Sequence, residues 1–187
     1  MSATADARRR ILRLALPIVG GMLSQTGLNV IDTAMVSTLG DTALAAVGLA
    51  SNVNALCFSF FMGMAAGVQA TVARWRGEIR HGEVAVPLNG GLLLAIGLGV
   101  PATLGLIALA PAALRLLADD PAVAELGTPY LTVRLLGLLG VAMNFAFRGY
   151  WNAVERSGLY LRTILLIHAV NIGLNWVLIF GHLGFPL

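Results

Sequence analysis

The uncharged run from Thr42 to Ala73, TALAAVGLASNVNALCFSFFMGMAAGVQATVA, decides the fold class, because its 32 consecutive residues include no charged side chain. A hydrocarbon core about 30 Å thick is crossed by about 20 helical residues. The run is therefore long enough to span a bilayer with tilt, or with an extra turn beyond it. It predicts a transmembrane helix over residues 42–73.

Stretches of the same kind lie on both sides of this run. Every backbone polar group must be satisfied internally in lipid, and the ten-residue alternation of a membrane barrel is not found, so all of them are predicted to be helices. The sequence therefore predicts an all-α membrane protein, with a tail at residues 1–13 followed by a polytopic bundle of about five transmembrane helices over 14–187. The predicted spans cover residues 14–40, 42–73, 84–114, 126–147 and 163–187.

The composition agrees with a membrane protein and excludes several function classes. The chain of 187 residues is 58% hydrophobic and 11% charged, with a mean hydropathy of +0.84, whereas a soluble domain carries about 25% charged residues. Its arginines are too dispersed for a nucleic-acid surface. Cys57 is the single cysteine, and no group of His, Asp, Glu or Cys has triad or metal-ligand spacing, so we predict neither an enzyme nor a bound cofactor.

The distribution of arginine predicts the topology. Positive loops face the cytoplasm, which places the N-terminus inside and predicts a multi-pass protein of the cell inner membrane. The apolar run after the first arginines continues to Gly40, longer than the core of a signal peptide, so it is predicted to be a retained helix. Ten arginines fall on the side predicted to be cytoplasmic: Arg8, Arg9, Arg10, Arg13, Arg74, Arg76, Arg80, Arg148, Arg156 and Arg162.

Polar side chains share one face of the first predicted span. Gln25, Asn29 and Asp32 are spaced i, i+4 and i+7. A charged side chain at the bilayer centre costs roughly 2.5–3.5 kcal/mol on insertion scales, and intramembrane ionisable groups are functional by default. Asp32 therefore needs polar neighbours. It can exchange a proton or, among amide oxygens, hold a sodium ion, which makes it the candidate for coupling to a cation.

A second polar stripe lies on the last predicted span. His168, Asn171 and Asn175 are spaced i, i+3 and i+7, and because neither stripe can face lipid cheaply, both are predicted to line a common interior cavity with Gln25 and Asn29. Two other interpretations remain open. The amides can act as hydrogen-bonding glue between helices, and His168 can be a structural histidine rather than a proton relay.

Proline and glycine mark places where helices bend or pack. Pro17 lies about two turns before the first polar stripe and lacks an N–H, which predicts a hinge or a static bend. Gly63 and Gly67 form a GxxxG pair that predicts close helix packing. The third span is expected to pack closely for the same reason, through Gly90, Gly91, Gly97, Gly99 and Gly105.

An ordered set of short motifs resembles the N-terminal bundle of the MATE (multidrug and toxic compound extrusion) transporters, in the DinF-like branch. The resemblance extends over nearly the whole chain. Its pieces are Leu14-Ala15-Leu16-Pro17, Asp32-Thr33-Ala34-Met35-Val36, Leu39-Gly40, Leu44-Ala45-Ala46-Val47-Gly48-Leu49, Gly63 with Gly67, Arg148-Gly149-Tyr150, Asn171, Leu178-Ile179-Phe180-Gly181 and Gly184.

The resemblance implies a transporter of twelve helices, with this chain as most of one six-helix lobe. It implies export of drugs or organic cations by alternating access in exchange for H⁺ or Na⁺, in which a second lobe or a partner chain completes the cleft. By the same resemblance Asp32 is the coupling carboxylate and possible Na⁺ ligand, Pro17 the hinge and Asn171 a cavity residue. Prokaryotic relatives often have an aspartate where Asn175 stands, so Asp32 is expected to act largely alone.

Two alternatives to drug efflux remain open. A lipid-linked oligosaccharide flippase needs basic residues in its cavity, and Arg134 alone lies within a predicted span. A non-transporting scaffold or fragment would use the polar stripes only to hold helices together. The expected partners are the lipid bilayer and an organic cation or drug, with no nucleic acid.

Overall fold

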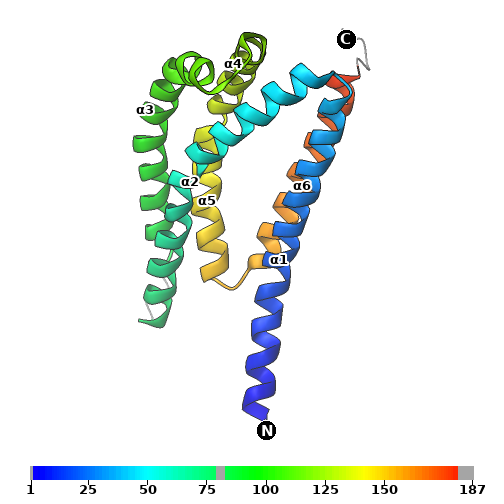
Figure 1. The fold of residues 1–187 in the computed structure, drawn as a ribbon. Helices are drawn as coiled ribbons and strands as arrows, with labels where there is room; N and C mark the ends of the chain where they lie inside the picture. The colour runs from blue at the N-terminus through cyan, green and yellow to red at the C-terminus, as the bar shows by residue number, and fades with distance from the viewer. Residues whose placement is uncertain (1, 79–82, 181–187) are drawn as a thin grey trace. The chain divides into compact units, whose positions relative to one another are not determined.

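The computed structural model describes residues 2–78 and 83–180, and every element in those ranges is a helix or a connection between helices. Four helices are long and apolar enough to cross a membrane, and a pair bent by 44° forms a fifth span if it is counted as one. The all-α membrane class and the expected number of spans are therefore confirmed. The helices (Figure 1) are α1 (Ser2–Ser37), α2 (Asp41–Gly77), α3 (Val86–Leu117), α4 (Pro121–Leu136), α5 (Leu138–Ala153) and α6 (Ser157–Ile179).

The chain divides into two compact units where a single bundle over 14–187 was expected. The first unit contains α1 and α6 and comprises Met1–Thr38 and Val154–Leu187, while the second contains α2 to α5 over Leu39–Ala153. The second unit is thus inserted, in sequence, between the two helices of the first.

Three helix boundaries differ from the predicted ones. The expected tail at 1–13 belongs to α1, which begins at Ser2, because an alanine- and arginine-rich segment without glycine or proline favours a helix. The last helix begins at Ser157 rather than at residue 163, so only residues 154–156 connect it to α5. The end of the predicted span 163–187 lies outside the described residues.

The predicted helix over 126–147 is two helices, α4 and α5, which meet at Gly137 at an angle of 44°. The N–H of Gly137 donates to the carbonyls of Arg134 and Leu135, which closes α4 with a tightened last turn. α4 also begins before residue 126. Asp120 caps it by accepting a 2.8 Å hydrogen bond from the N–H of Ala122, and Pro121 supplies the fixed φ that favours a first helical position.

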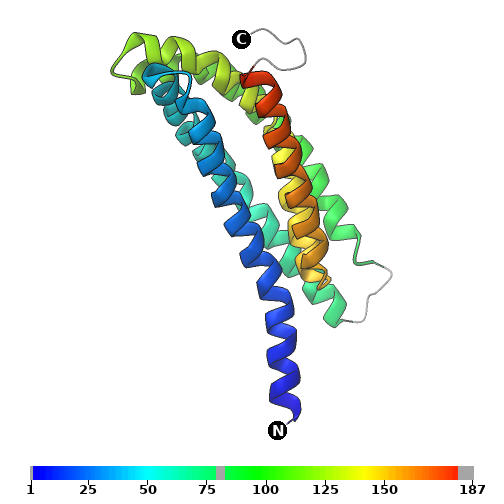
Figure 2. The ribbon, with the colours of Figure 1, turned by 90° about the vertical axis from the view of Figure 1, so that its right-hand side faces the viewer.

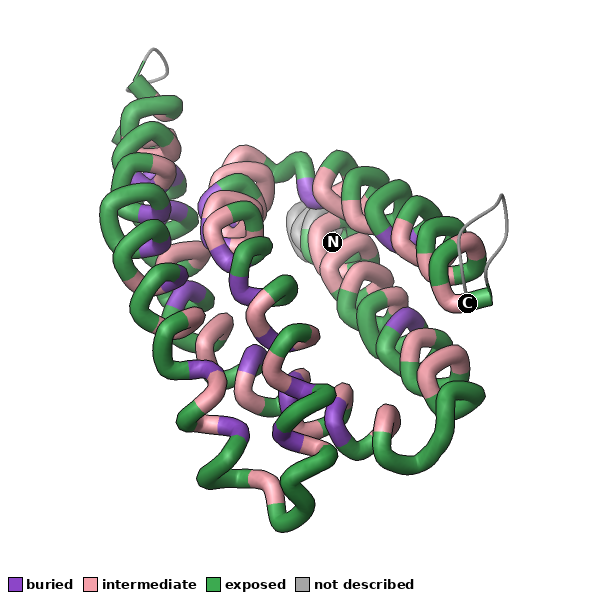
Figure 3. Tube along the Cα trace, turned by 90° about the horizontal axis from the view of Figure 1, so that it is seen from above, coloured by how far each residue is buried: buried purple, intermediate pink, exposed green. Residues whose placement is uncertain are grey.

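The core of the second unit is built from leucine and alanine on the facing sides of α2 to α5. Leu114, Leu131 and Leu138 are fully buried, and small residues such as Ala50 and Ala142 are buried beside them. Purple segments in Figure 3 mark these buried positions along the four helices. Alanine at such positions lets helices approach closely, which is the usual packing in membrane bundles.

Close helix approach occurs at glycines other than the expected pair. No atom of the described chain lies within 4 Å of a Cβ built on Gly63 or Gly67, so the GxxxG prediction is wrong for contacts within this chain. The expected packing of the third span holds at Gly91 and Gly99, which face Val68 and Leu139. It fails at Gly90, Gly97 and Gly105, which have no such neighbour within 4 Å in the described part of the chain. Among the glycines that the structure describes, the closest approach is at Gly149 of α5, where a built Cβ would lie only 2.2 Å from the carbonyl oxygen of Ala65 in α2.

Asn54 of α2 is 1% exposed, and its buried Oδ1 has no hydrogen-bond partner in the described structure. A buried polar atom without a partner carries a desolvation cost that an apolar side chain of similar size does not. We therefore expect Asn54→Leu to raise the free energy of unfolding by about 1 kcal/mol. Thermal unfolding of the chain in detergent measures the effect. Asn52→Leu, at an exposed position of the same helix, is the control for added hydrophobicity, and an Asn54→Leu protein less stable than it would contradict the prediction.

The first unit is a pair of helices that run in the same direction (Figures 1 and 2). Few of its residues are buried, and Leu28, Ser157 and His168 are the described ones below a tenth exposed. Leu161 of α6 packs against Gly20 of α1. Because the apolar contact between the two helices is small, polar contacts carry much of their association.

Candidate functional site

The polar contacts between α1 and α6 keep one register over the length of the pair. Ser157 donates to the carbonyl of Leu14 at 3.3 Å, Gln25 contacts His168 at 3.2 Å, and Asn175 contacts Asp32 at 2.8 Å, and in each case the partners are 143 residues apart. A constant offset is possible only when the helices are parallel and do not slip against each other. The two predicted stripes therefore meet residue by residue.

Asp32 lies half-buried on α1 and is held by an amide from α6. The Nδ2 of Asn175 donates to Asp32 Oδ1 at 2.8 Å and to Asn171 Oδ1 at 3.2 Å. A hydrogen bond to an ionised carboxylate is about twice as strong as one between neutral groups. The strength of this contact therefore depends on the charge that Asp32 carries. The three side chains together offer carboxylate and amide oxygens to a small cation.

His168 lies on α6 two helical turns before Asn175. It connects α6 to Gln25 and Asn29, the remaining predicted side chains of α1. Its Nδ1 lies 2.6 Å from the hydroxyl of Ser24 and its Nε2 lies 3.2 Å from Gln25 Oε1. Gln25 in turn donates to Asn29 Oδ1 at 3.3 Å. His168 is 6% exposed, whereas Gln25 and Asn29 are exposed in this chain. The structure thus brings all six predicted polar residues into two neighbouring clusters; their role in lining a cavity stays a prediction.

Pro17 lies within α1, which continues as one helix on both sides of it. Proline cannot donate to the carbonyl four residues earlier, and in membrane helices a neighbouring serine often satisfies the freed backbone group. The carbonyl that lacks its helical donor is that of Arg13, and Ser157, 2% exposed at the start of α6, donates to the carbonyl of the next residue, Leu14. The beginning of α6 is therefore tied to α1 at the proline. The hinge function of Pro17 stays a prediction.

Ser24 and Ser157 were not predicted as site residues. Ser24 precedes Asp32 by eight residues and Leu28 by four, so it belongs to the same helix face, and extending the stripe backward by one residue would have found it. Ser157 carries no such signal, because it begins a helix whose start the hydropathy pattern placed six residues later.

The chemistry available to these clusters is that of a carboxylate, amides, a hydroxyl and an imidazole. Within the described ranges no group of three His, Cys, Asp or Glu side chains is placed to hold a metal ion. Asp32 is the one acid of the α1–α6 clusters. It can bind a proton, or a monovalent cation that the amide oxygens of Asn171 and Asn175 would help to hold.

Comparison with known proteins gives one family and a consistent set of relatives. A family model described as MatE matches residues 17–177. The probable multidrug resistance protein NorM of Rhizobium meliloti (strain 1021) is 33% identical over 178 residues, which cover 95% of this chain and 38% of that protein. The multidrug resistance protein MdtK of Yersinia enterocolitica is 27% identical over 95% of this chain and 39% of its own length.

Solved structures share this helical fold. Two described as MATE in the straight and in the bent conformation match with TM-scores of 0.85 and 0.86, at 28% and 26% identity, over 94% and 95% of this chain. Each match covers 39% or 40% of the solved chain. The chain therefore spans about two-fifths of the length of its relatives. Since the relatives named here are NorM and MdtK proteins, the DinF-like branch stays a prediction.

Proposed function

The chain belongs to the MatE family, and from that premise we propose that it forms the N-terminal part of a multidrug efflux transporter in which Asp32 couples export of an organic cation to entry of H⁺ or Na⁺. The observation that carries the proposal is the bond from Asn175 Nδ2 to Asp32 Oδ1. It places the carboxylate of a membrane-spanning helix against a polar partner on a second helix, where a change of charge changes how the two helices are held.

The asparagine at position 175 supports the expectation that Asp32 acts with a single carboxylate. Two carboxylates at this distance cannot both be ionised without strong repulsion. An amide instead donates a hydrogen, as Asn175 does here, and adds no second negative charge. The site is thus suited to bind one positive charge at a time.

We propose the following use of that charge. When Asp32 is ionised, the charge-assisted bond from Asn175 holds α1 against α6. When a proton or Na⁺ neutralises the carboxylate, this bond weakens and α1 is released to repack, with Pro17 as the bending point. An organic cation and the coupling ion then bind in alternation, since each favours a different packing of the helices.

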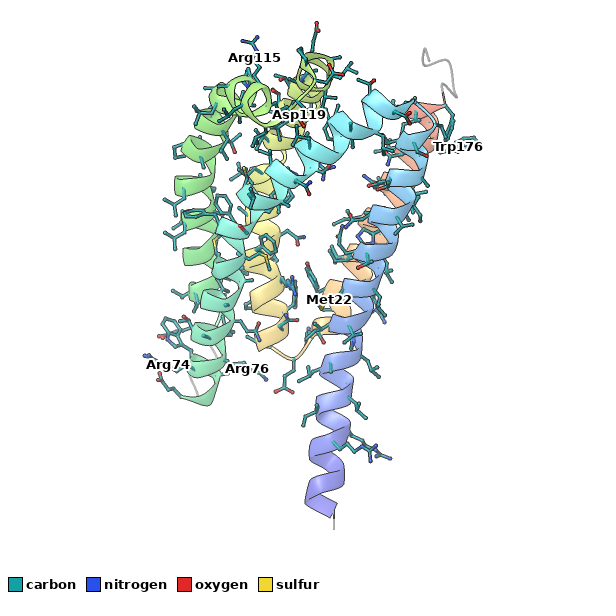
Figure 4. All side chains as sticks on the ribbon, viewed as in Figure 1. Met22, Arg74, Arg76, Arg115, Asp119 and Trp176 are labelled. Carbon is teal, nitrogen blue, oxygen red and sulfur yellow. The ribbon has the colours of Figure 1, made fainter. Side chains whose placement is uncertain are left out.

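We also propose the orientation with the N-terminus in the cytoplasm of an inner-membrane protein. In the second unit Arg74 and Arg76 lie at one end, and Arg115 lies with Asp119 at the opposite end (Figure 4). Glu78 pairs with Arg74 at 3.0 Å at the first end, but acids contribute little to the positive-inside bias, and the end with more arginines is typical of the cytoplasmic side. The flippase alternative receives no comparable support, since Arg134 donates to the hydroxyl of Tyr130 on its own helix at 2.7 Å.

Ion binding at Asp32 can be measured on this chain directly. We expect infrared difference spectra in lipid nanodiscs to show an exchangeable carboxyl band that responds to pH, to Na⁺ or to both, and that is absent from Asp32→Asn. The variant is needed because the chain contains 9 acidic residues. Which ion shifts the band identifies the coupling ion.

Asp41→Asn is the matched control, because Asp41 is an exposed aspartate at the first turn of α2. Its loss should leave the Asp32 band in place. A band that responds to neither ion, or that persists in Asp32→Asn, would refute the proposed role of Asp32 and favour a scaffold in which the polar stripes only hold helices together.

A further inference from the structure

His168 of α6 contacts two consecutive residues of α1, one with each ring nitrogen. Nδ1 lies 2.6 Å from Ser24 Oγ, Nε2 lies 3.2 Å from Gln25 Oε1, and the side chain is 6% exposed. Consecutive residues of an α-helix are about 100° apart around its axis. A ring that holds both therefore opposes rotation of α6 against α1 as well as sliding along it.

The neighbouring bonds determine where the ring carries its hydrogen. Gln25 Nε2 donates to Asn29 Oδ1, so the amide of Gln25 presents its oxygen to His168, and an oxygen can only accept. Nε2 of His168 therefore carries the hydrogen in this contact. In a ring with one hydrogen, Nδ1 is then the acceptor, and the hydroxyl of Ser24 donates to it. Each polar atom of this cluster has a defined role, as expected of a contact that fixes geometry.

The alignment of α6 along α1 that His168 sets is the same alignment that brings Asn175 to Asp32. His168 and Gln25 are 143 residues apart, as are Asn175 and Asp32, and in each helix the two contacts are separated by seven residues, or about two turns. Sliding α6 by one residue would remove Asn175 from the carboxylate. The other described charged or phenolic side chains on α1 and α6 lie nearer the N-terminal ends of the helices and do not alter this relation: Arg8, Arg9, Arg13, Tyr160 and Arg162.

We infer that His168 is a positioning residue, whose double contact with Ser24 and Gln25 sets the α1–α6 register that holds Asn175 on Asp32. The importance of this register for transport rests on the proposed function of Asp32. The geometric claim does not, and it is the part that the following experiment tests.

The experiment uses nuclear magnetic resonance of the whole chain in nanodiscs, with ¹⁵N in asparagine and histidine. We expect the Nε2 of His168 to carry a hydrogen that is shared with Gln25. We also expect the side-chain amide of Asn175 to show a hydrogen-bonded proton shift, for which Asp32→Ala supplies the broken-bond reference. His168→Phe keeps a ring but has no donor or acceptor. It should change the proton shift of the Asn175 amide by at least half of the difference between the wild-type chain and Asp32→Ala.

His168→Gln and Leu161→Ala are the matched variants. Glutamine can donate to Gln25 and accept from Ser24, so it should restore the wild-type position of the Asn175 amide. Leu161 lies seven residues before His168 and packs on Gly20, so its truncation loosens the same helix pair without removing a polar contact and should leave the amide in place. Where His168→Phe does not fold, Ser24→Ala combined with Gln25→Met removes both partners and is expected to give the same shift.

An Asn175 amide unchanged in His168→Phe, or in the double variant where that is used, would overturn the inference. Equal movement in Leu161→Ala would overturn it too, because general loosening would then be the cause. These outcomes are independent of ion binding. An Asp32 that binds neither H⁺ nor Na⁺ in the wild-type chain refutes the proposed function but leaves the register result as it stands.

Discussion

Asp32→Asn is expected to abolish drug efflux in a version of the protein that carries both lobes, while expression and membrane insertion stay at the wild-type level. Asparagine has nearly the same shape as aspartate and can still accept from Asn175 Nδ2 through its own oxygen. What it lacks is the charge that exchanges with a proton or Na⁺. Drug accumulation in cells, with and without an ion gradient, measures the loss.

Asn175→Asp makes the complementary change and serves as the comparison. It keeps a carboxylate at Asp32 but replaces the donor beside it with a second acid, so we expect transport to persist with an altered dependence on pH or Na⁺ rather than to disappear. Undiminished efflux in Asp32→Asn would show that coupling occurs elsewhere in the protein.

Gly149→Ala is expected to destabilise the second unit strongly. The added Cβ would lie 2.2 Å from the carbonyl oxygen of Ala65 and 3.1 Å from the backbone nitrogen of Gln69. These are backbone atoms of α2, so no side chain can rotate away and α5 must move as a whole. Overpacking of a core typically costs about 1–3 kcal/mol, occasionally more. A lower thermal unfolding midpoint in detergent is the expected result.

Gly140→Ala tests whether this effect belongs to the contact or to glycine itself. Gly140 lies on the same helix, and no atom of the described chain lies within 4 Å of a Cβ built there. Replacing glycine by alanine within a helix is favourable by up to about 1 kcal/mol when nothing obstructs it. The control should therefore be neutral or stabilising. An equal decrease of the thermal unfolding midpoint in both variants would contradict the close approach of α5 to α2.

The polar site was largely predictable because helix geometry relates spacing in sequence to position on a face. Gln25 and Asp32 are separated by seven residues, as are His168 and Asn175, and two parallel helices with that spacing can form two contacts at once. The predicted stripes needed no tertiary information beyond the assumption that they meet. Ser24 was missed only because a serine in an apolar helix is a weaker signal than an acid or an amide.

Contacts that depend on tertiary packing were not predictable. Gly63 with Gly67 has the GxxxG spacing, yet Gly149, without a glycine partner at that spacing, makes the closest approach. Which glycine contacts the backbone of another helix depends on how each helix is rotated about its own axis. The hydropathy pattern does not determine that rotation. The break at Gly137 is hidden for the same reason, since leucines continue on both sides of it.

The insertion of α2 to α5 between the two halves of the α1–α6 pair has a consequence for biogenesis. A ribosome completes Asp32 well before Asn175, so the first helix is synthesised without the side chain that later donates to its acid. Five further helices, α2 to α6, must be synthesised before Asn175 can reach Asp32. We expect the nascent chain to be most exposed to membrane quality control in this interval, which ends when α6 emerges and pairs with α1.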